Sequence, residues 1–124
     1  MKKEKSILVI EDDIDLCNSI MSALQRSGYR PFGASELREA TLKLKNQTFA
    51  CILVDMRLGA DSGEELIEFI RERKDAQNID TPILVISGHL DKSLVAKIAK
   101  KIQGALVKPF DMNALLESVE KHAG

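Results

Sequence analysis

Cys51-Ile52-Leu53-Val54-Asp55-Met56-Arg57-Leu58 contains an apolar run that stops at a carboxylate. Four to eight apolar residues that end at a charge are typical of a buried parallel strand. In open α/β sheets, ligands bind at the carboxyl ends of such strands. Asp55 is therefore either a functional group at that edge or a residue that caps the next turn, where aspartate is common. The rest of the chain decides between these two interpretations.

Composition indicates an ordinary globular domain. The chain has 124 residues, of which 44% are hydrophobic and 30% charged, and its net charge is −1. We expect a single domain over residues 1–124 that buries its own core, with no direct nucleic-acid or membrane surface. No long apolar segment follows the charged start, so we expect no signal peptide, no membrane span and a cytoplasmic location. Cys17 and Cys51 lie in apolar patterns and are expected to be buried free thiols.

Five apolar runs alternate with segments that carry apolar residues at helical spacing. The expected strands are 6–10, 29–32, 50–55, 82–87 and 104–107. The helical stripes cover 16–24, 37–44, 66–70, 94–102 and 112–119. This (βα)₅ alternation predicts a doubly wound α/β three-layer sandwich with a five-stranded parallel sheet and right-handed crossovers. Strand order 2-1-3-4-5 fits best, because Pro31 cannot donate to a ladder and so favours an edge for its strand.

Polar residues mark the helix ends. Gly28 is expected to end the first helix as a C-cap, and Ser35 to cap the second. Ser62 and Glu65 have the spacing of a capping box before the third helix, after a loop over 58–61. Asp111 is placed to cap the last helix.

The predicted strand order brings the chemistry together. Strands 1 and 3 are neighbours at the switch point of the sheet, where a crevice opens. Glu11 and Asp12, which follow strand 1, should therefore converge on Asp55. Ser87 and Lys108, which end strands 4 and 5, should border the same crevice.

Three gathered carboxylates need a cation. Two unit charges about 4 Å apart cost roughly 4 kcal/mol at an effective dielectric constant near 20. Oxygen ligands alone favour Mg²⁺, with Mn²⁺ as a substitute, and the cluster has no histidine or cysteine for zinc. A divalent cation and Lys108 around Asp55 would suit phosphoryl transfer, with Asp55 as the nucleophile and Ser87 as a hydrogen-bond donor to phosphate. Each residue also has a plain structural alternative as a helix start, a cap or a solvated lysine.

These residues carry a resemblance that covers the chain from Ile7 to about His122. The sequence is similar to a response-regulator receiver domain, the phosphoacceptor half of two-component signalling. The matching motifs share one order and spacing, and are Ile7-Leu-Val-Ile-Glu11-Asp12-Asp13, Leu53-Val-Asp55, Gly63, Ile86-Ser87-Gly88 and Lys108-Pro109-Phe110.

The resemblance implies a role for each matching position. Asp55 would be the site of phosphorylation, and Asp12 a direct metal ligand. Glu11 would hold metal-bound water, and the backbone carbonyl of Arg57 would be the third protein ligand.

The resemblance also implies a phosphate-binding pair and a cis bond. Ser87 matches the family's switch hydroxyl. Lys108 matches the lysine that bridges to the phosphate. A cis peptide bond is expected between Lys108 and Pro109.

The chain departs from the family pattern at two places that matter for switching. Gly59 stands where receivers commonly have a proline, which should loosen that loop. Ala105 stands where the family has its switch aromatic, so the usual aromatic relay is in doubt. Arg57 and His89 occupy positions that border the path of the attacking water, and we expect them to tune the lifetime of the phosphorylated form. They either shield the acyl phosphate or, for His89, orient a water as a general base.

The implied function is a phosphoacceptor switch. It would take a phosphoryl group from a histidine kinase or histidine phosphotransfer protein, and then control a downstream protein or fused output domain. It would be no enzyme beyond its own phosphorylation and autodephosphorylation, and a phosphorylation-dependent homodimer stays open.

Three alternatives remain. Ala105 favours a phosphorylation-independent interaction module. A flavin protein of the same architecture is disfavoured by the acidic turn after the first strand. An aspartyl hydrolase would have a second acid where Arg57 stands.

Overall fold

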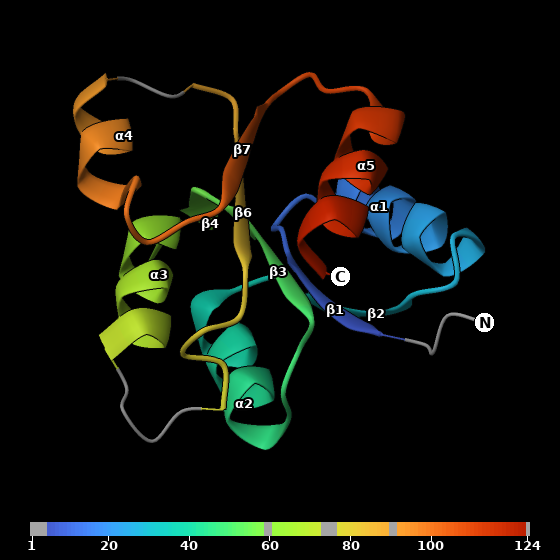
Figure 1. Ribbon diagram of the computed structural model, residues 1–124, viewed down its shortest axis with the longest axis horizontal. Coiled ribbons are helices and arrows are strands. Elements are labelled where there is room, and N and C mark those ends of the chain that lie inside the picture. The colour runs from blue at the N-terminus through green and yellow to red at the C-terminus, as the bar shows by residue number, and fades with distance from the viewer. Residues whose placement is uncertain (1–4, 59–60, 73–76, 90–91, 124) are drawn as a thin grey trace.

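The computed structural model describes residues 5–58, 61–72, 77–89 and 92–123 (Figure 1). Its central sheet has five parallel strands, in the order β2-β1-β3-β6-β7. These strands are β1 (Ser6–Ile10), β2 (Arg30–Ala34), β3 (Cys51–Asp55), β6 (Ile83–Ser87) and β7 (Gly104–Val107). Numbered by the five main strands alone, this is the predicted order 2-1-3-4-5, so the doubly wound α/β fold is confirmed.

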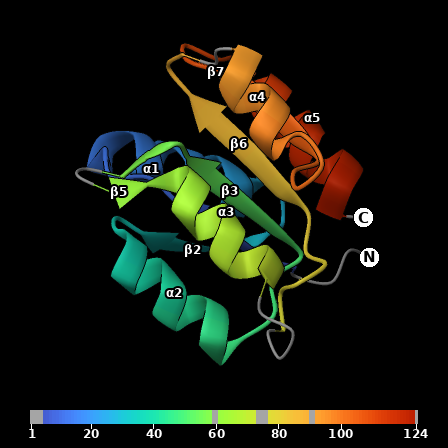
Figure 2. The same ribbon diagram turned by 90° about the vertical axis from the view of Figure 1, so that its left-hand side faces the viewer.

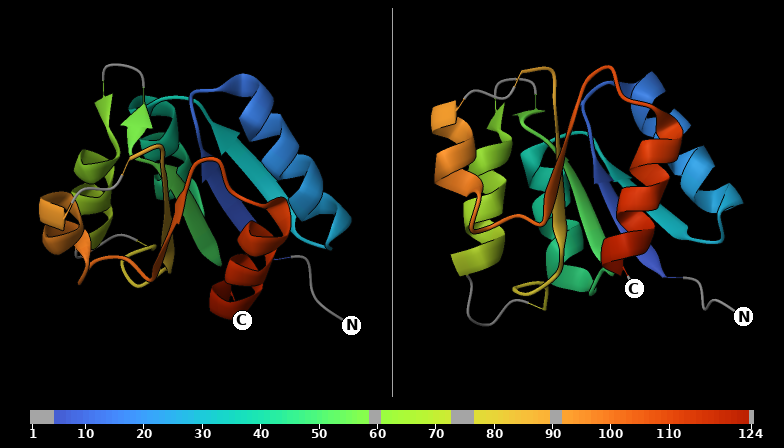
Figure 3. Two further views of the ribbon diagram at one scale, coloured as in Figure 1. Left: turned by 90° about the horizontal axis from the view of Figure 1, so that it is seen from above. Right: turned by 45° about the horizontal axis from the view of Figure 1, so that its top comes forward.

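Helices cover both faces of the sheet (Figures 1 and 3). The helices are α1 (Ile14–Arg26), α2 (Leu37–Asn46), α3 (Gly63–Glu72), α4 (Lys92–Ile98) and α5 (Met112–Ala123). One face carries α1 and α5, and Figure 2 shows α2, α3 and α4 in front of the other face. β3 and β6 are buried along their whole length because helices pack on both sides of them. None of the helices in the described parts of the chain is long and apolar enough to cross a bilayer.

Sequence periodicity explains the two cores. Alternate residues of a strand point to opposite faces, so Leu8 and Ile10 pack toward α2 and α3, whereas Ile7 and Val9 pack toward α1 and α5. Cys17 and Cys51 are buried free thiols, as predicted. Pro31 lies in the edge strand β2 and is paired with Ile7. The outer side of an edge strand has no neighbouring strand, so a residue without an N–H is tolerated there.

Two helix ends agree with the sequence prediction. Gly28 follows α1 with a φ of 92°, a left-handed conformation that glycine adopts without steric cost. The Asp111 carboxylate accepts a hydrogen bond from the N–H of Asn113 at 2.8 Å, which caps α5. The type of one local residue, a glycine or an aspartate, is therefore enough to predict each of these helix ends.

Three local predictions were wrong or incomplete. Glu36, not Ser35, is the N-cap residue of α2, because the N–H and hydroxyl of Ser35 donate to the carboxylate of Glu39 instead. α4 ends at Ile98, although the apolar stripe runs on to residue 102. Ser62 caps α3, but its hydroxyl accepts from the N–H of Glu64 at 3.1 Å, one residue earlier than in a capping box.

The predicted loop over 58–61 is not wholly irregular. β4 (Arg57–Leu58) pairs with β5 (Asp61–Ser62) as a two-residue antiparallel ladder. Gly59, the residue expected to loosen this loop, lies outside the described residues. The segments on both sides of it are nevertheless held by pairing.

A buried amide secures the edge of the sheet opposite the predicted site. Asn78 is 1% exposed, and its side chain makes four hydrogen bonds. Its carbonyl oxygen accepts from the N–H of Phe49 at 2.8 Å and from the hydroxyl of Thr81 at 3.1 Å. Its amide nitrogen donates to the carbonyls of Leu44 and Gln47, each at 2.9 Å. The segment before β6 is therefore fixed to the connection between α2 and β3.

Arg71 joins α3 to the chain that follows α4. Its guanidinium donates to the carbonyls of Lys101 at 2.9 Å and Ile79 at 2.7 Å, and to the side-chain oxygen of Gln103 at 3.1 Å. Gln103 in turn accepts from the N–H of Ile83, at the start of β6. Burial lowers the pKa of Arg71, but arginine stays charged at any ordinary pH.

Candidate functional site

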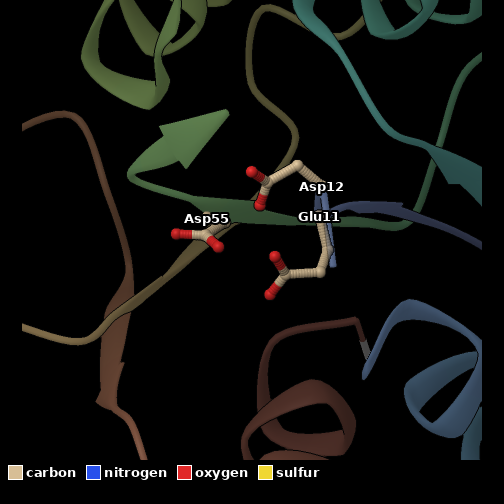
Figure 4. Close-up of side chains that lie close together, drawn as sticks. All are labelled: Glu11, Asp12 and Asp55. Atoms are coloured by element: carbon tan, nitrogen blue, oxygen red, sulfur yellow. The ribbon is translucent and has the colours of Figure 1, made fainter. Parts of the chain in front are cut away.

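Strand register places three carboxylates together. Ile10 of β1 is opposite Val54 of β3, so Glu11 and Asp55, the next residues, lie side by side at the carboxyl edge. Carboxylate oxygens of Glu11, Asp12 and Asp55 all lie within 4.8 Å of one another (Figure 4). Glu11 and Asp55 are only 1% and 4% exposed, whereas Asp12 is open to solvent. Two buried acids and one exposed acid thus face a common point.

Asp13, the third acid of the run after β1, has a different task. Its carboxylate is the N-cap of α1 and accepts from the N–H of Leu16 at 3.1 Å. Its own N–H donates to Oε2 of Glu11 at 3.2 Å. Asp13 therefore starts the helix and orients Glu11 at the same time.

Lys108 neutralises part of the buried charge. Its ammonium lies 2.8 Å from Oε1 of Glu11 and 2.8 Å from Oδ2 of Asp55. Burial alone would lower the pKa of Lys108, but its hydrogen bonds to Asp55 and Glu11 outweigh burial and raise the pKa. The lysine is therefore fully charged at neutral pH. The peptide bond between Lys108 and Pro109 is cis.

One cation is not enough for this cluster. Burial, followed by the hydrogen bond with Asp55, raises the pKa of Glu11 to about 7, so this carboxyl group holds its proton more tightly than an ordinary glutamate does. Oε1 of Glu11 is buried and, apart from its ion pair with Lys108, has no well-formed hydrogen bond within the described residues. An all-oxygen set of three carboxylates, which carries more negative charge than Lys108 neutralises, fits a hydrated divalent cation such as Mg²⁺.

The remaining predicted residues line one cleft beside Asp55. The cleft has a volume of about 650 Å³ and is lined by Asp12, Asp55, Met56, Arg57, Ser87, Gly88, His89, Leu94 and Lys108. The N–H of Arg57 donates to Oδ1 of Asp55 at 3.0 Å. The hydroxyl of Ser87 donates to the carbonyl of His89 at 2.8 Å and accepts from its N–H at 3.2 Å. The hydroxyl is thus held by its own turn.

Sequence reasoning missed Met56, Gly88 and Leu94, which also line the cleft. Met56 and Gly88 adjoin predicted residues, so their nearness to Asp55 and Ser87 in the sequence was the only available signal. Leu94 comes from α4, and its approach depends on how that helix packs, which apolar spacing does not encode.

Ala105 lies away from the cleft lining. It is an exposed residue of β7, paired with Val85, and Val107 on the same face of the strand is 52% exposed. No aromatic side chain stands in β7, whose sequence is Gly-Ala-Leu-Val. The replacement of the family's switch aromatic by Ala105 therefore also means that the exposed face of β7 carries small aliphatic side chains and no aromatic ring.

Comparison with known proteins agrees with this geometry. Residues 7–120 match the family described as the response regulator receiver domain. The chain belongs to this family. Receiver domains are regulatory phosphoacceptors of two-component signalling, so the family resemblance inferred from the motifs is confirmed.

Two solved structures show how closely the receiver fold is kept. Chemotaxis protein CheY4 of Vibrio cholerae is 26% identical, with a TM-score of 0.88, over 96% of this chain and 98% of that one. A response regulator of Burkholderia pseudomallei is 28% identical, with a TM-score of 0.84, over 97% of this chain and 69% of that one. Its structure contains a phosphorylated aspartic acid, a calcium ion and citrate.

Curated relatives are longer than this chain. Regulatory protein VanRB of Enterococcus faecalis is 31% identical over 115 residues, which are 92% of this chain and 50% of the relative. Acid tolerance regulatory protein ActR of Sinorhizobium medicae is 29% identical over 124 residues, 98% of this chain and 61% of the relative. The receiver domain thus spans about half the length of these relatives.

Proposed function

We propose that this receiver domain accepts a phosphoryl group on Asp55 in a Mg²⁺-dependent reaction. The observation that carries the proposal is the buried pair of Glu11 and Asp55 with Lys108 at 2.8 Å from both. A structural helix start needs neither two buried acids nor a lysine between them. The related Burkholderia pseudomallei response regulator, whose structure contains a phosphorylated aspartic acid and a calcium ion, supports the same chemistry.

A carboxylate oxygen of Asp55 would attack the phosphorus of the donor. The new bond is an acyl phosphate, and the bond from phosphorus to the leaving nitrogen of a phosphohistidine breaks. Lys108, already in contact with Asp55, would shift its hydrogen bond to a phosphoryl oxygen. The hydroxyl of Ser87 would exchange the carbonyl of His89 for another phosphoryl oxygen, which links phosphorylation to the turn after β6.

A divalent cation, when bound, would neutralise charge that develops on the phosphoryl oxygens. Asp12 and Asp55 would bind it directly, together with the backbone carbonyl of Arg57. Glu11 would accept from metal-bound water with its buried Oε1. Mn²⁺ would substitute for Mg²⁺, because both take oxygen ligands.

Arg57 and His89 would set the lifetime of the phosphorylated form. Both line the cleft around Asp55, and His89 is exposed at its mouth. Their side chains would shield the acyl phosphate, or His89 would orient the attacking water during autodephosphorylation.

The partners follow from this chemistry. A histidine kinase or histidine phosphotransfer protein would supply the phosphoryl group in the cytoplasm. Output would pass to a downstream protein or to a fused domain, as the greater length of the relatives suggests. Residues 1–124 would act as one receiver domain.

Intact mass spectrometry after incubation with acetyl phosphate and Mg²⁺ tests the proposal. We expect one added phosphoryl group, absent without Mg²⁺ and absent from Asp55→Asn. If no label appears under conditions that phosphorylate another receiver, the second candidate function gains: a phosphorylation-independent interaction module, which the alanine at 105 favours.

A further inference from the structure

Gly63 approaches the backbone at the end of the phosphoacceptor strand more closely than a side chain would allow. A Cβ at this position would lie 2.5 Å from the carbonyl oxygen of Asp55 and 2.8 Å from Cα of Met56. Both atoms belong to the main chain, so they cannot rotate away as the end of a side chain does. The φ of Gly63 is not in the left-handed region. The position therefore requires glycine for space, not for conformation.

The close approach allows Gly63 to close a hairpin. Its N–H donates to the carbonyl of Met56 at 3.0 Å, and beyond this bond Arg57 pairs with Ser62 and Leu58 with Asp61. Hydrogen-bonded and non-hydrogen-bonded pairs alternate along an antiparallel ladder. The bond from Gly63 to Met56 marks a hydrogen-bonded position of this ladder, although the N–H of Met56 donates to the carbonyl of Ile86 in β6 at 3.0 Å. The next pair, Arg57 and Ser62, is therefore a non-hydrogen-bonded pair.

This register decides where the main chain of Arg57 points. In a non-hydrogen-bonded pair, the N–H and the carbonyl of each residue are both directed away from the partner strand. The N–H of Arg57 follows this rule, since it donates to Oδ1 of Asp55 at 3.0 Å. The carbonyl of Arg57 is therefore directed toward the same side, where the acids gather.

Two further contacts hold the hairpin in place. Leu58 is 2% exposed and packs in the core shared with α3. The hydroxyl of Ser62 accepts from the N–H of Glu64, which joins the second strand of the hairpin to the first turn of α3.

We propose that Gly63 is a positioning residue for the metal site. By closing the hairpin at Met56, it fixes the N–H of Arg57 on the Asp55 carboxylate and the carbonyl of Arg57 toward the cation. The inference rests on the proposed function in one respect, namely that this carbonyl is a metal ligand. It goes further in assigning the orientation of that ligand to a glycine that touches neither metal nor phosphate.

Magnesium titration by calorimetry tests the proposal without any phosphorylation step. Gly63→Ala should raise the Mg²⁺ dissociation constant by about tenfold or more, as loss of support around a metal ligand does. Circular dichroism establishes that the variant is folded at the temperature used. Gly104→Ala is the matched control, since its Cβ would lie 3.0 Å from Cδ2 of Leu84, a side chain that can move. We expect its dissociation constant to stay within about twofold of wild type.

A second pair of variants serves if Gly63→Ala does not fold. Leu58→Ala removes the core anchor of the hairpin, and Leu66→Ala removes an equally buried leucine of α3 from the same core. Both should lower the melting temperature by similar amounts, because each removes a buried leucine side chain from this core. Only Leu58→Ala should weaken Mg²⁺ binding, and equal dissociation constants for the two variants would overturn the proposal.

The two proposals fail differently. If wild type binds no Mg²⁺ and takes no phosphoryl group, the proposed function is wrong. If wild type does both and Gly63→Ala, when folded, binds Mg²⁺ as tightly, only the role of Gly63 is wrong.

Discussion

Glu11 should make magnesium binding depend on pH. Its carboxyl group, buried beside Asp55, has a pKa of about 7 in the metal-free protein. A cation that uses this carboxylate has to displace the proton first, so protons and Mg²⁺ compete. Binding should strengthen as the pH rises through neutrality.

The pKa sets the size of the effect. With a pKa of about 7, roughly one molecule in eleven has an ionised Glu11 at pH 6, compared with about ten in eleven at pH 8. The apparent Mg²⁺ dissociation constant should therefore be about tenfold higher at pH 6 than at pH 8.

Glu11 also determines whether the metal-free protein becomes more or less stable as the pH rises. The folded pKa of Glu11 is above its ordinary value of 4.5, so the folded state holds this proton more tightly than the unfolded state. The contribution to stability is complete below about pH 4.5 and is lost as the pH rises through about 7. The loss amounts to about 3 kcal/mol of unfolding free energy. Saturating Mg²⁺ should offset it above neutrality.

Titration calorimetry at several pH values measures the first effect, and thermal unfolding with EDTA or Mg²⁺ measures the second. His89 lines the same cleft, so His89→Gln is the control and should keep the wild-type profile. Glu11→Gln should flatten it. A wild-type dissociation constant that is the same at pH 6 and pH 8, or a Glu11→Gln variant that keeps the slope, would refute the reasoning.

Three further predictions concern the cleft and the opposite edge of the sheet. Asp12→Asn should leave the metal-free melting temperature at or above that of wild type, because it relieves like-charge repulsion. It should also largely remove the rise in melting temperature that Mg²⁺ produces, which scanning calorimetry measures. Arg57→Ala and His89→Ala should each change the dephosphorylation rate, which loss of the added mass with time measures; unchanged rates in both would end the idea. Asn78→Ala, measured by urea denaturation, should cost about 3 kcal/mol, because it removes the hydrogen-bond partner of the N–H of Phe49 and of the carbonyls of Leu44 and Gln47, whereas exposed Gln77→Ala should cost about 0.5 kcal/mol.

The fold could be predicted because its signals are local. The three central strands β1, β3 and β6 are apolar runs that end at or just before a polar residue, and burial on both faces makes such runs continuous. Pro31 alone was enough to predict an edge position for β2, because proline cannot donate to a ladder. The meeting of Glu11 with Asp55 then followed from strand order, which is a property of the whole pattern.

The parts that could not be predicted depend on which partner a polar group or a backbone segment finds in the folded chain. Ser35 has the chemistry of an N-cap, yet the Glu39 carboxylate takes its N–H and hydroxyl, and α2 starts one residue later. The apolar stripe of α4 runs past Ile98, but the carbonyl of Lys101 is bound by Arg71, which holds the chain outside a helix. The hairpin after Asp55 depends on a space that only the assembled backbone defines.

Arg71 also gives α4 two unequal ends. At the carboxyl end, Ile98 is 1% exposed and Arg71 holds the following turn, so local unfolding there would expose apolar surface and remove two acceptors, the carbonyl of Lys101 and the side-chain oxygen of Gln103, from the half-buried guanidinium. Toward the amino end, Lys92, Val95 and Ala96 are exposed, so opening there would uncover less buried apolar surface. The free energy of local opening therefore rises along this one helix from its first residue to its last, and solvent exchange of its amide hydrogens follows that gradient.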